Sequence, residues 1–323
     1  MRCIYNTETN PYFNLAAEEY VMDNFEDELF MLWRNEPAVI IGKYQNALAE
    51  INTEFVEANN IAVVRRMTGG GAVFHDLGNL NFTFVRNGAV SDFRGFSQPI
   101  LLALRELGVN ACFQGRNDLT VNDMKISGNA ECVRNGRTLH HGTLLFSAKM
   151  DYIAESLKVN PLKFQDKAVK SVRKRVANIA DYLVEPMLVT DFVEYMMEFV
   201  MKLYPSAFSY TFDNKDIESI NRLKKEKYGT WEWNYGSSPA YSFSKMIRTQ
   251  GGTVEVCLNL VKSHIEEIKF YGDFFVQKDI AEFENFFKGY PHRRDAVEML
   301  LQNVRVGDYL INVSEEDILN LLF

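Results

Sequence analysis

The chain has 323 residues, 47% of them hydrophobic, which is enough for two domains and typical of a folded globular protein. Its formal net charge of −8 argues against general nucleic-acid binding, and the polar N-terminal residues and the absence of a long apolar run lead us to expect neither a signal peptide nor a membrane span. The four cysteines lack metal or disulfide spacing, which favours the reducing cytoplasm: Cys3, Cys112, Cys132 and Cys257.

Hydrophobic periodicity predicts mixed helices and strands in the first third of the chain. Helical patterns cover residues 14–24 and 97–107. Strand-like runs cover residues 38–41, 62–66 and 80–85.

Three adjacent glycines, Gly69, Gly70 and Gly71, follow Arg65 and Arg66. Glycine weakens a strand end, but its bare backbone admits a ligand closely and can turn consecutive N–H groups toward an anion. The spacing fits neither the Walker loop nor the dinucleotide fingerprint. It predicts a phosphate or carboxylate site, with a tight turn between two strands as the alternative.

Residues 118–127 read as a hairpin with a two-residue Asn-Asp turn at 122–123. This register would place Thr120 opposite Lys125 and Asp118 opposite Ser127. Because side chains alternate along a strand, these four would share one polar face. The alternative is a solvated face with an ordinary surface ion pair.

The rest of the chain reads as a hairpin, a helical stretch and a second unit. Residues 125–146 predict two antiparallel strands around the turn at Asn135-Gly136. We expect a catalytic domain over residues 1–245 and an accessory domain over 246–323. The later patterns predict helices at 191–204 and 216–227, a break at 236–239, strands at 254–260 and 265–270 around a turn at 262–263, and helices at 280–287, 296–304 and 315–322.

The stretch 65–79 and several dispersed motifs resemble lipoate-protein ligases of the biotin/lipoate ligase superfamily. The resemblance spans nearly the whole chain and implies an α+β fold: a catalytic domain with a mixed, mainly antiparallel sheet, plus a small β-then-α C-terminal domain. The matching motifs are residues 14–19, 32–35, 41–46, 115–119, 125–128, 140–145, 171–176 and 231–234.

The resemblance implies ATP-dependent ligation of lipoate to a specific lysine through a lipoyl-AMP intermediate, with ATP and Mg²⁺ as cofactors. The implied partners are lipoyl domains of 2-oxoacid dehydrogenase E2 subunits, the glycine cleavage H protein, or both. It implies a cytoplasmic enzyme with no nucleic-acid or membrane partner.

The same resemblance assigns the site residues. Lys125, in the Lys-Ile-Ser-Gly motif, would be catalytic and touch both substrates, holding the acid's carboxylate against the α-phosphate. Asp118 would orient Lys125 or bind the metal, and the sequence does not choose between these roles. The remaining assignments are Arg66, Gly71, Ala72, Val73 and Phe74 for ATP, Gly70 and His75 for lipoate, and Asn117 and Glu18 as supporting residues.

Other conspicuous residues have ordinary explanations. His75, His140 and His141 lack metal-site spacing, and paired histidines on a strand usually form structural hydrogen bonds. Glu18 and Glu19 lie on a helical pattern where a solvent-facing carboxylate is the default. A basic run at 167–175 is usually a solvated surface, but it aligns with a family segment, and the resemblance implies that it contacts the acceptor or covers the acyl adenylate.

Two other functions fit the same superfamily. A transferase would use a cysteine thiolate and an acyl donor instead of ATP, and Cys132 is the nearby candidate. A non-catalytic binding module would keep the pocket but lose the lysine, so the presence of Lys125 argues against it. Biotin ligase is more distant, because the motifs are those of the lipoate branch.

Overall fold

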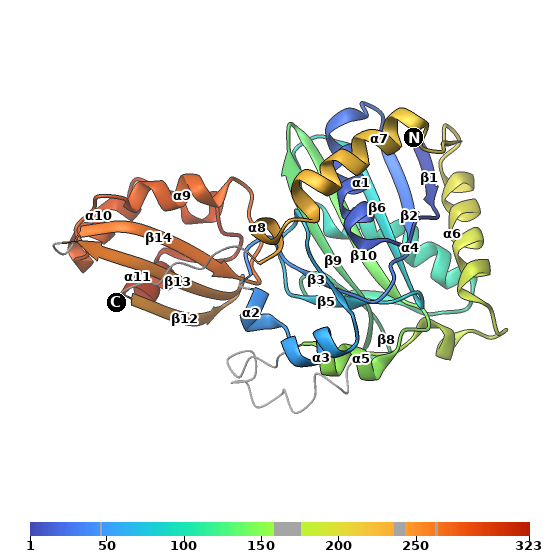
Figure 1. Ribbon diagram of the computed structural model, residues 1–323, viewed down its shortest axis with the longest axis horizontal. Coiled ribbons are helices and arrows are strands. Elements are labelled where there is room, and N and C mark those ends of the chain that lie inside the picture. Colours follow the sequence, from blue (N-terminus) through green and yellow to red (C-terminus); the bar gives the residue numbers. More distant parts are fainter. Residues whose placement is uncertain (46, 158–175, 236–242, 262–263) are drawn as a thin grey trace.

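The computed structural model describes residues 1–45, 47–157, 176–235, 243–261 and 264–323. Figure 1 shows a larger body that contains the N-terminus and a smaller one that contains the C-terminus, which meet near α8 (Trp231–Asn234). None of the helices in these ranges is long and apolar enough to cross a membrane. The predicted break at 236–239, turn at 262–263 and basic run at 167–175 fall outside the described residues.

The larger body is built on a mixed eight-stranded sheet. β1 (Arg2–Asn6) runs parallel to both of its neighbours, and the other pairs are antiparallel. The mixed, mainly antiparallel sheet of the prediction is therefore confirmed. The strand order is β11 (Phe208–Ser209), β1, β2 (Leu29–Trp33), β6 (Asn79–Asn87), β10 (Arg137–Leu145), β9 (Met124–Arg134), β8 (Asp118–Val121) and β7 (Cys112–Gln114).

The two faces of this sheet have different chemistry, as β6 shows. Leu80, Phe82 and Phe84 pack in the apolar core beneath α4 (Phe93–Glu106) and α6 (Val189–Leu203). The alternate residues of β6, Asn79, Asn81 and Thr83, are also buried, on the face covered by α1 (Pro11–Asn24). A row of buried polar side chains therefore lies inside the protein on that face, where each needs a hydrogen-bond partner.

A small sheet carries the triple glycine. Its central strand β3 (Ala38–Ile41) is parallel to β4 (Ala62–Arg65) and antiparallel to β5 (Val73–His75), and the glycines lie in the loop between β4 and β5. Short helices flank this sheet: α2 (Ala47–Glu50), α3 (Thr53–Ala58) and α5 (Met150–Ser156). The remaining elements are η2 (Ile179–Tyr182), α7 (Asn214–Leu223) and the π-helix η3 (Lys224–Tyr228).

Every helix and strand predicted within the described residues overlaps an observed element, although most of their ends differ, and local chemistry explains one of the larger differences. The helix predicted to begin at residue 97 begins at Phe93, because the side chain of Asp92 caps it by accepting a hydrogen bond from the Gly95 N–H at 2.9 Å. The predicted turn at Asn135 and Gly136 is confirmed, with φ values of 52° and 71°.

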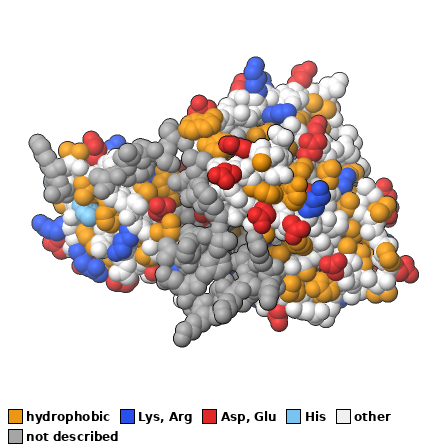
Figure 2. Space-filling model, turned by 60° about the horizontal axis from the view of Figure 1, so that its bottom comes forward, with side chains coloured by type: hydrophobic (Ala, Val, Ile, Leu, Met, Phe, Trp, Pro, Cys, Tyr) orange, Lys and Arg blue, Asp and Glu red, His pale blue; other side chains and the backbone are white. Residues whose placement is uncertain are grey.

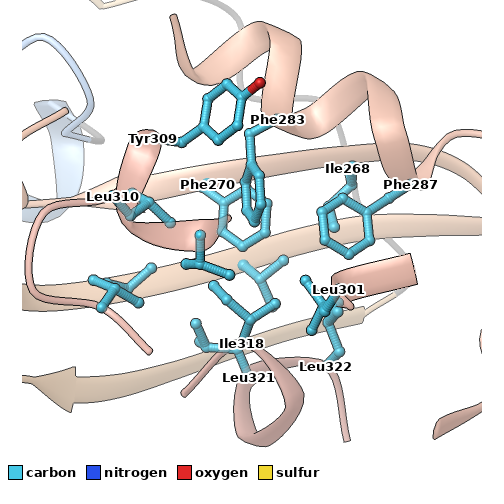
Figure 3. Packing of buried hydrophobic residues seen from close by; sticks show 14 of the residues in the cluster. Ile268, Phe270, Phe283, Phe287, Leu301, Tyr309, Leu310, Ile318, Leu321 and Leu322 are labelled. Carbon is cyan, nitrogen blue, oxygen red and sulfur yellow. The ribbon is translucent and has the colours of Figure 1, made fainter. Parts of the chain in front are cut away.

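The smaller body is a three-stranded antiparallel sheet covered by helices, which confirms the predicted β-then-α order. Figure 3 shows its core, where Phe283 and Phe287 from α9 (Ile280–Phe287) point at Phe270 of β14 (His264–Gly272). The elements are β12 (Phe243–Thr249), β13 (Gly252–Val261), β14 (His264–Gly272), α9 (Ile280–Phe287), α10 (Arg294–Leu301), η4 (Val306–Asp308) and α11 (Glu315–Leu322).

The surface of the larger body carries both charge signs. On the face drawn in Figure 2, acidic, basic and apolar side chains are interspersed over its described part. This face therefore presents no single-sign field that would steer a polyanion toward it.

The aromatic core of the smaller body predicts a stability difference between neighbouring residues of α9. Phe283 is fully buried, so Phe283→Ala should lower the free energy of unfolding of the unit that contains it by about 3–5 kcal/mol. Phe286 is 40% exposed, and Phe286→Ala should cost less than about 1 kcal/mol. Denaturant titration of both variants checks this, and equal losses would contradict the packing described above.

Candidate active site

Two adjoining cavities lie between the large sheet and the segment that follows the glycines, and the first of them is also bordered by the smaller body. The first has a volume of about 420 Å³ and the second about 620 Å³. The residues that line both are Ala72, Val73, Asp118, Lys125, Gly128 and Thr143. These residues mark the junction of the two cavities.

Lys125 stands at this junction in an ion pair. Its Nζ lies 2.7 Å from Asp118 Oδ1, and both side chains are partly exposed to the cavities. Because the pair is partly solvated, it orients the ammonium more than it stabilises the fold. Lys125 is thus placed to contact a molecule in either cavity.

The hairpin register differs from the predicted one because β9 contains a bulge. Thr120 pairs with Lys125 as predicted, but the pairing then skips one residue of β9. Asp118 therefore pairs with Gly128 and not with Ser127. A Cβ on Gly128 would lie 3.0 Å from Lys125 Nζ, so these two residues share a face. Ser127 is instead fully buried away from the cavities, and the prediction that it shares the face of Lys125 is wrong.

Arg66 shapes the triple-glycine loop. Its buried guanidinium donates to the carbonyls of Gly69, Gly71 and Ile40 and to Thr68 Oγ1, at distances of 2.6 to 3.2 Å. Burial lowers its pKa to about 10, so the group stays charged at neutral pH. Arg66 lines the first cavity, but its N–H groups mainly hold the loop backbone.

The glycines are needed for close approach. Gly70 adopts a φ of +90°, and a Cβ on Gly69 would lie 2.3 Å from the carbonyl oxygen of Phe274. The N–H of Gly70 donates to that same carbonyl at 3.2 Å. Gly71 faces the first cavity, where a Cβ would have Asp273 Cβ as its nearest neighbour at 3.8 Å.

The smaller body closes the first cavity. Arg116 donates to the carbonyls of Gly251 and Asp273, and its guanidinium lies 4.6 Å from the ring centroid of Phe275. Arg248, Gln250 and Asp273 line the cavity from that side. The site is therefore completed by a part of the chain far from the glycine motif in sequence.

Glu18 is fully buried, so the expectation of a solvent-facing carboxylate is wrong. It accepts from Thr83 Oγ1 at 2.6 Å and pairs with His141 Nδ1 at 2.9 Å. His141 Nε2 in turn lies 2.8 Å from Thr68 Oγ1, which accepts from Arg66. This chain of contacts connects Glu18 to the glycine loop.

Glu19 is also buried rather than solvent-facing. Burial alone would raise its pKa, but hydrogen bonds from Lys227, Tyr228 and Arg134 at 2.5 to 3.0 Å bring the pKa below its ordinary value. These contacts connect α1 to η3 and β9, so Glu19 has a structural role.

The histidines form hydrogen bonds inside the sheet, as predicted. His75 lies between Asn35 Nδ2 at 3.1 Å and Thr143 Oγ1 at 2.8 Å. Burial lowers its pKa to about 3, so the ring is neutral at physiological pH. His140 pairs with Glu131 and stacks on Phe96.

The structure brings most of the predicted site residues to one cavity. Phe74 is an exception in part, because its side chain is buried in the core beside β3 and borders only the second cavity. Glu18 lies behind His141. The predicted residues that line the first cavity are Arg66, Gly70, Gly71, Ala72, Val73, His75, Asn117, Asp118 and Lys125.

Several cavity residues were not assigned from the sequence. Alternation in the strand that follows Gly136 could have placed His141 and Thr143 on one face, and the polar alternation of β6 could have indicated Asn81. Arg116 stands inside a matching motif but was given no role. The three residues from the smaller body carry no signal in the sequence, because their position depends on how the two bodies pack.

Two family models match the chain. Residues 10–200 match the lipoyl protein ligase A/B catalytic domain, and residues 238–322 match the bacterial lipoate protein ligase C-terminus. Among curated proteins, the chain is 39% identical to lipoate-protein ligase LplJ of Bacillus subtilis, covering 97% of each chain. It is 38% identical to lipoate–protein ligase 1 of Staphylococcus aureus, covering 98% of each.

Solved structures are similar in fold. P. falciparum LipL1 in complex with lipoate superposes with a TM-score of 0.82 at 23% identity, covering 99% of this chain and 97% of that one. A lipoate-protein ligase A bound with ATP gives a TM-score of 0.64 at 29% identity, covering 73% of this chain and 98% of that one. A bipartite lipoate protein ligase from Thermoplasma acidophilum gives 0.66 at 31% identity, covering 75% and 98%.

The neutral state of His75 predicts a pH dependence. The folded protein resists protonation of this ring until about pH 3, whereas the unfolded chain takes up the proton near pH 6.5. Its contribution to stability is therefore complete above pH 6.5 and is lost as the pH falls toward 3. When the pH is lowered from 7 to 5, the free energy of unfolding should therefore fall by about 2 kcal/mol less in His75→Gln than in the wild type. Urea titrations at both pH values measure this, and equal losses in the two proteins would contradict it.

Proposed function

The chain belongs to the lipoyl protein ligase A/B family, and we propose that it catalyses ATP-dependent ligation of lipoate to a specific lysine through lipoyl-AMP. The observation that carries this proposal is the position of Lys125, whose side chain borders two adjoining cavities. One cavity would hold the acid and the other the nucleotide.

In the first half-reaction, a carboxylate oxygen of lipoate attacks the α-phosphorus of ATP, and the bond to pyrophosphate breaks. Both reactants are anions that repel each other on approach. The Lys125 ammonium, oriented by Asp118 at 2.7 Å, lies between them and stabilises the developing charge.

The glycine loop would position the nucleotide. Gly71 lines the first cavity and Ala72 lines both, and such bare or small residues let phosphate approach the backbone. Arg66 would act mainly by fixing the loop, since it holds the Gly69 and Gly71 carbonyls. Val73 and Phe74 continue into β5 beside the second cavity, and Gly70 and His75 would border the acid.

Mg²⁺ fits a carboxylate at the junction of the two cavities. The metal is commonly held by one or two carboxylates together with substrate phosphates, and Asp118 lines both cavities. Asp118 would hold it, and when bound it would shield charge on the leaving pyrophosphate. Asn117 supports the same wall by donating from Nδ2 to the carbonyl of Asn129 at 2.6 Å.

In the second half-reaction, the amine of an acceptor lysine attacks the carbonyl carbon of lipoyl-AMP and AMP leaves as the amide forms. We propose that the acceptors are lipoyl domains of 2-oxoacid dehydrogenase E2 subunits, the glycine cleavage H protein, or both. The Thermoplasma relative is described together with its E2 lipoyl domain, which supports this class of partner. We place the reaction in the cytoplasm, with residues 1–245 as the catalytic unit and 246–323 as the accessory unit, a boundary that falls inside β12 of the smaller body.

A cysteine-dependent transferase fits the geometry less well. Cys132 is the candidate nucleophile, but burial raises its pKa to about 12, so its sulfur is a thiol at neutral pH. It borders a cleft that Met67 and Gly69 also line and that Lys125 does not line. The ligase therefore remains the better-supported function.

The comparison of Lys125→Ala with Cys132→Ala tests the proposed function. Lys125→Ala should lower lipoate transfer to a purified lipoyl domain by on the order of 10² to 10⁴, because one preorganised cation is lost. Cys132→Ala should change it little, and transfer should require ATP in every case. ATP-independent transfer that disappears with Cys132 would instead establish the transferase.

The glycine loop gives a second prediction for activity. Gly71→Val should abolish adenylate formation while the protein stays folded, because its methyl groups would enter the cavity. Gly307→Val is the matched control, since a Cβ there has no neighbour within 4 Å and the residue is far from the site in η4. Pyrophosphate release with lipoate and ATP is the measurement. A folded Gly71→Val protein with wild-type activity would remove this loop from the active site.

A further inference from the structure

A line of hydrogen bonds runs through the buried polar side chains of the larger body and ends at Asn81. Asn14 Nδ2 lies 2.8 Å from Asn35 Oδ1, and Asn35 Nδ2 lies 3.1 Å from His75 Nδ1. His75 Nε2 lies 2.8 Å from Thr143 Oγ1, which lies 2.9 Å from Asn81 Oδ1. All five side chains belong to different elements or connections around the first cavity.

The direction of this line is fixed at its start. The two N–H groups of Asn14 Nδ2 face three oxygens, because the backbone carbonyls of Glu8 and Arg34 also lie at 2.9 Å, and carbonyls only accept. Asn35 must therefore accept with its oxygen and donate with its nitrogen to His75. A neutral ring that accepts at Nδ1 carries its proton at Nε2 and donates it onward.

The next contact in the line gives the orientation of the Asn81 amide. Thr143 Oγ1 accepts from His75 Nε2, and its own hydroxyl donates to Asn81 Oδ1 at 2.9 Å. Both N–H groups of Asn81 Nδ2 then remain without an acceptor among the described residues. The residue is buried and lines the first cavity.

Asn81 lies at the end of the cavity away from Lys125. Gly128, Thr143 and Asn81 are paired in one row across β9, β10 and β6. Two strand spacings separate Gly128 from Asn81, which is about 10 Å. Lys125 Nζ lies beside Gly128, so a carboxylate held there places the far end of an extended eight-carbon acid near Asn81.

We propose that Asn81 is a specificity-determining residue that distinguishes lipoate from octanoate by donating a hydrogen bond to a dithiolane sulfur. This inference rests on the proposed function for the identity of the acid. Sulfur is a weak acceptor, and the terminal carbons of octanoate offer none. Octanoate would therefore leave a buried donor unsatisfied, which is costly in a site enclosed by Trp33, Ile40 and Leu15.

The test measures binding of each acid by titration calorimetry without ATP. The ratio of the octanoate Kd to the lipoate Kd should fall by about tenfold in Asn81→Leu, which keeps the side-chain size but removes the donor. Thr143→Val should lower the ratio by a smaller factor, because the amide of Asn81 is then free to turn. Leu80→Val is the matched control on the opposite face of β6, and its ratio should equal that of the wild type.

The outcomes separate this inference from the proposed function. An unchanged ratio in a folded Asn81→Leu protein overturns the inference, even if the wild type ligates lipoate normally. A ratio that falls as expected supports it, even if the wild type forms no adenylate, in which case only the proposed function fails. A wild type that binds neither acid overturns the inference as well.

Discussion

The arrangement of this protein follows from the need to hold two anions in contact. A carboxylate and a triphosphate repel each other, and no side chain needs to form a covalent bond to overcome this. The structure supplies a lysine at the junction of two cavities, held by Asp118 at 2.7 Å, and a bare glycine backbone opposite it. The bulge in β9 serves the same arrangement, because it places Gly128 and not a larger residue against Lys125 Nζ.

The two bodies of the chain are coupled at this site. Tyr44 of the larger body belongs to the core of the smaller one and stacks on Phe274 at 5.2 Å between ring centroids. The carbonyl of Phe274 accepts from the N–H of Gly70, a donor that the sequence predicts for an anion. This N–H is therefore already satisfied by the smaller body, and the contact joins the glycine loop to that body.

Much of the fold could be predicted from the sequence because local signals agree with the packing. The strand at residues 38–41 and the helices at 280–287 and 315–322 have their predicted bounds, and Ser314 and Asp317 form the capping box that begins the last helix. The site could be predicted where its residues lie within one sequence motif, as Lys125 does. Burial of Glu18 was not predictable, because its partners Thr83 and His141 come from strands distant in sequence. The contribution of Asp273 was missed for the same reason.

The central claim is that Lys125 and the glycine loop activate lipoate with ATP before any acceptor is present. Lipoate-dependent exchange of labelled pyrophosphate into ATP by the wild-type protein, without a lipoyl domain, tests this most directly. The account predicts rapid exchange with lipoate and none with biotin. Absence of exchange with lipoate, from a folded protein that still transfers an acyl group to a lipoyl domain, would contradict it.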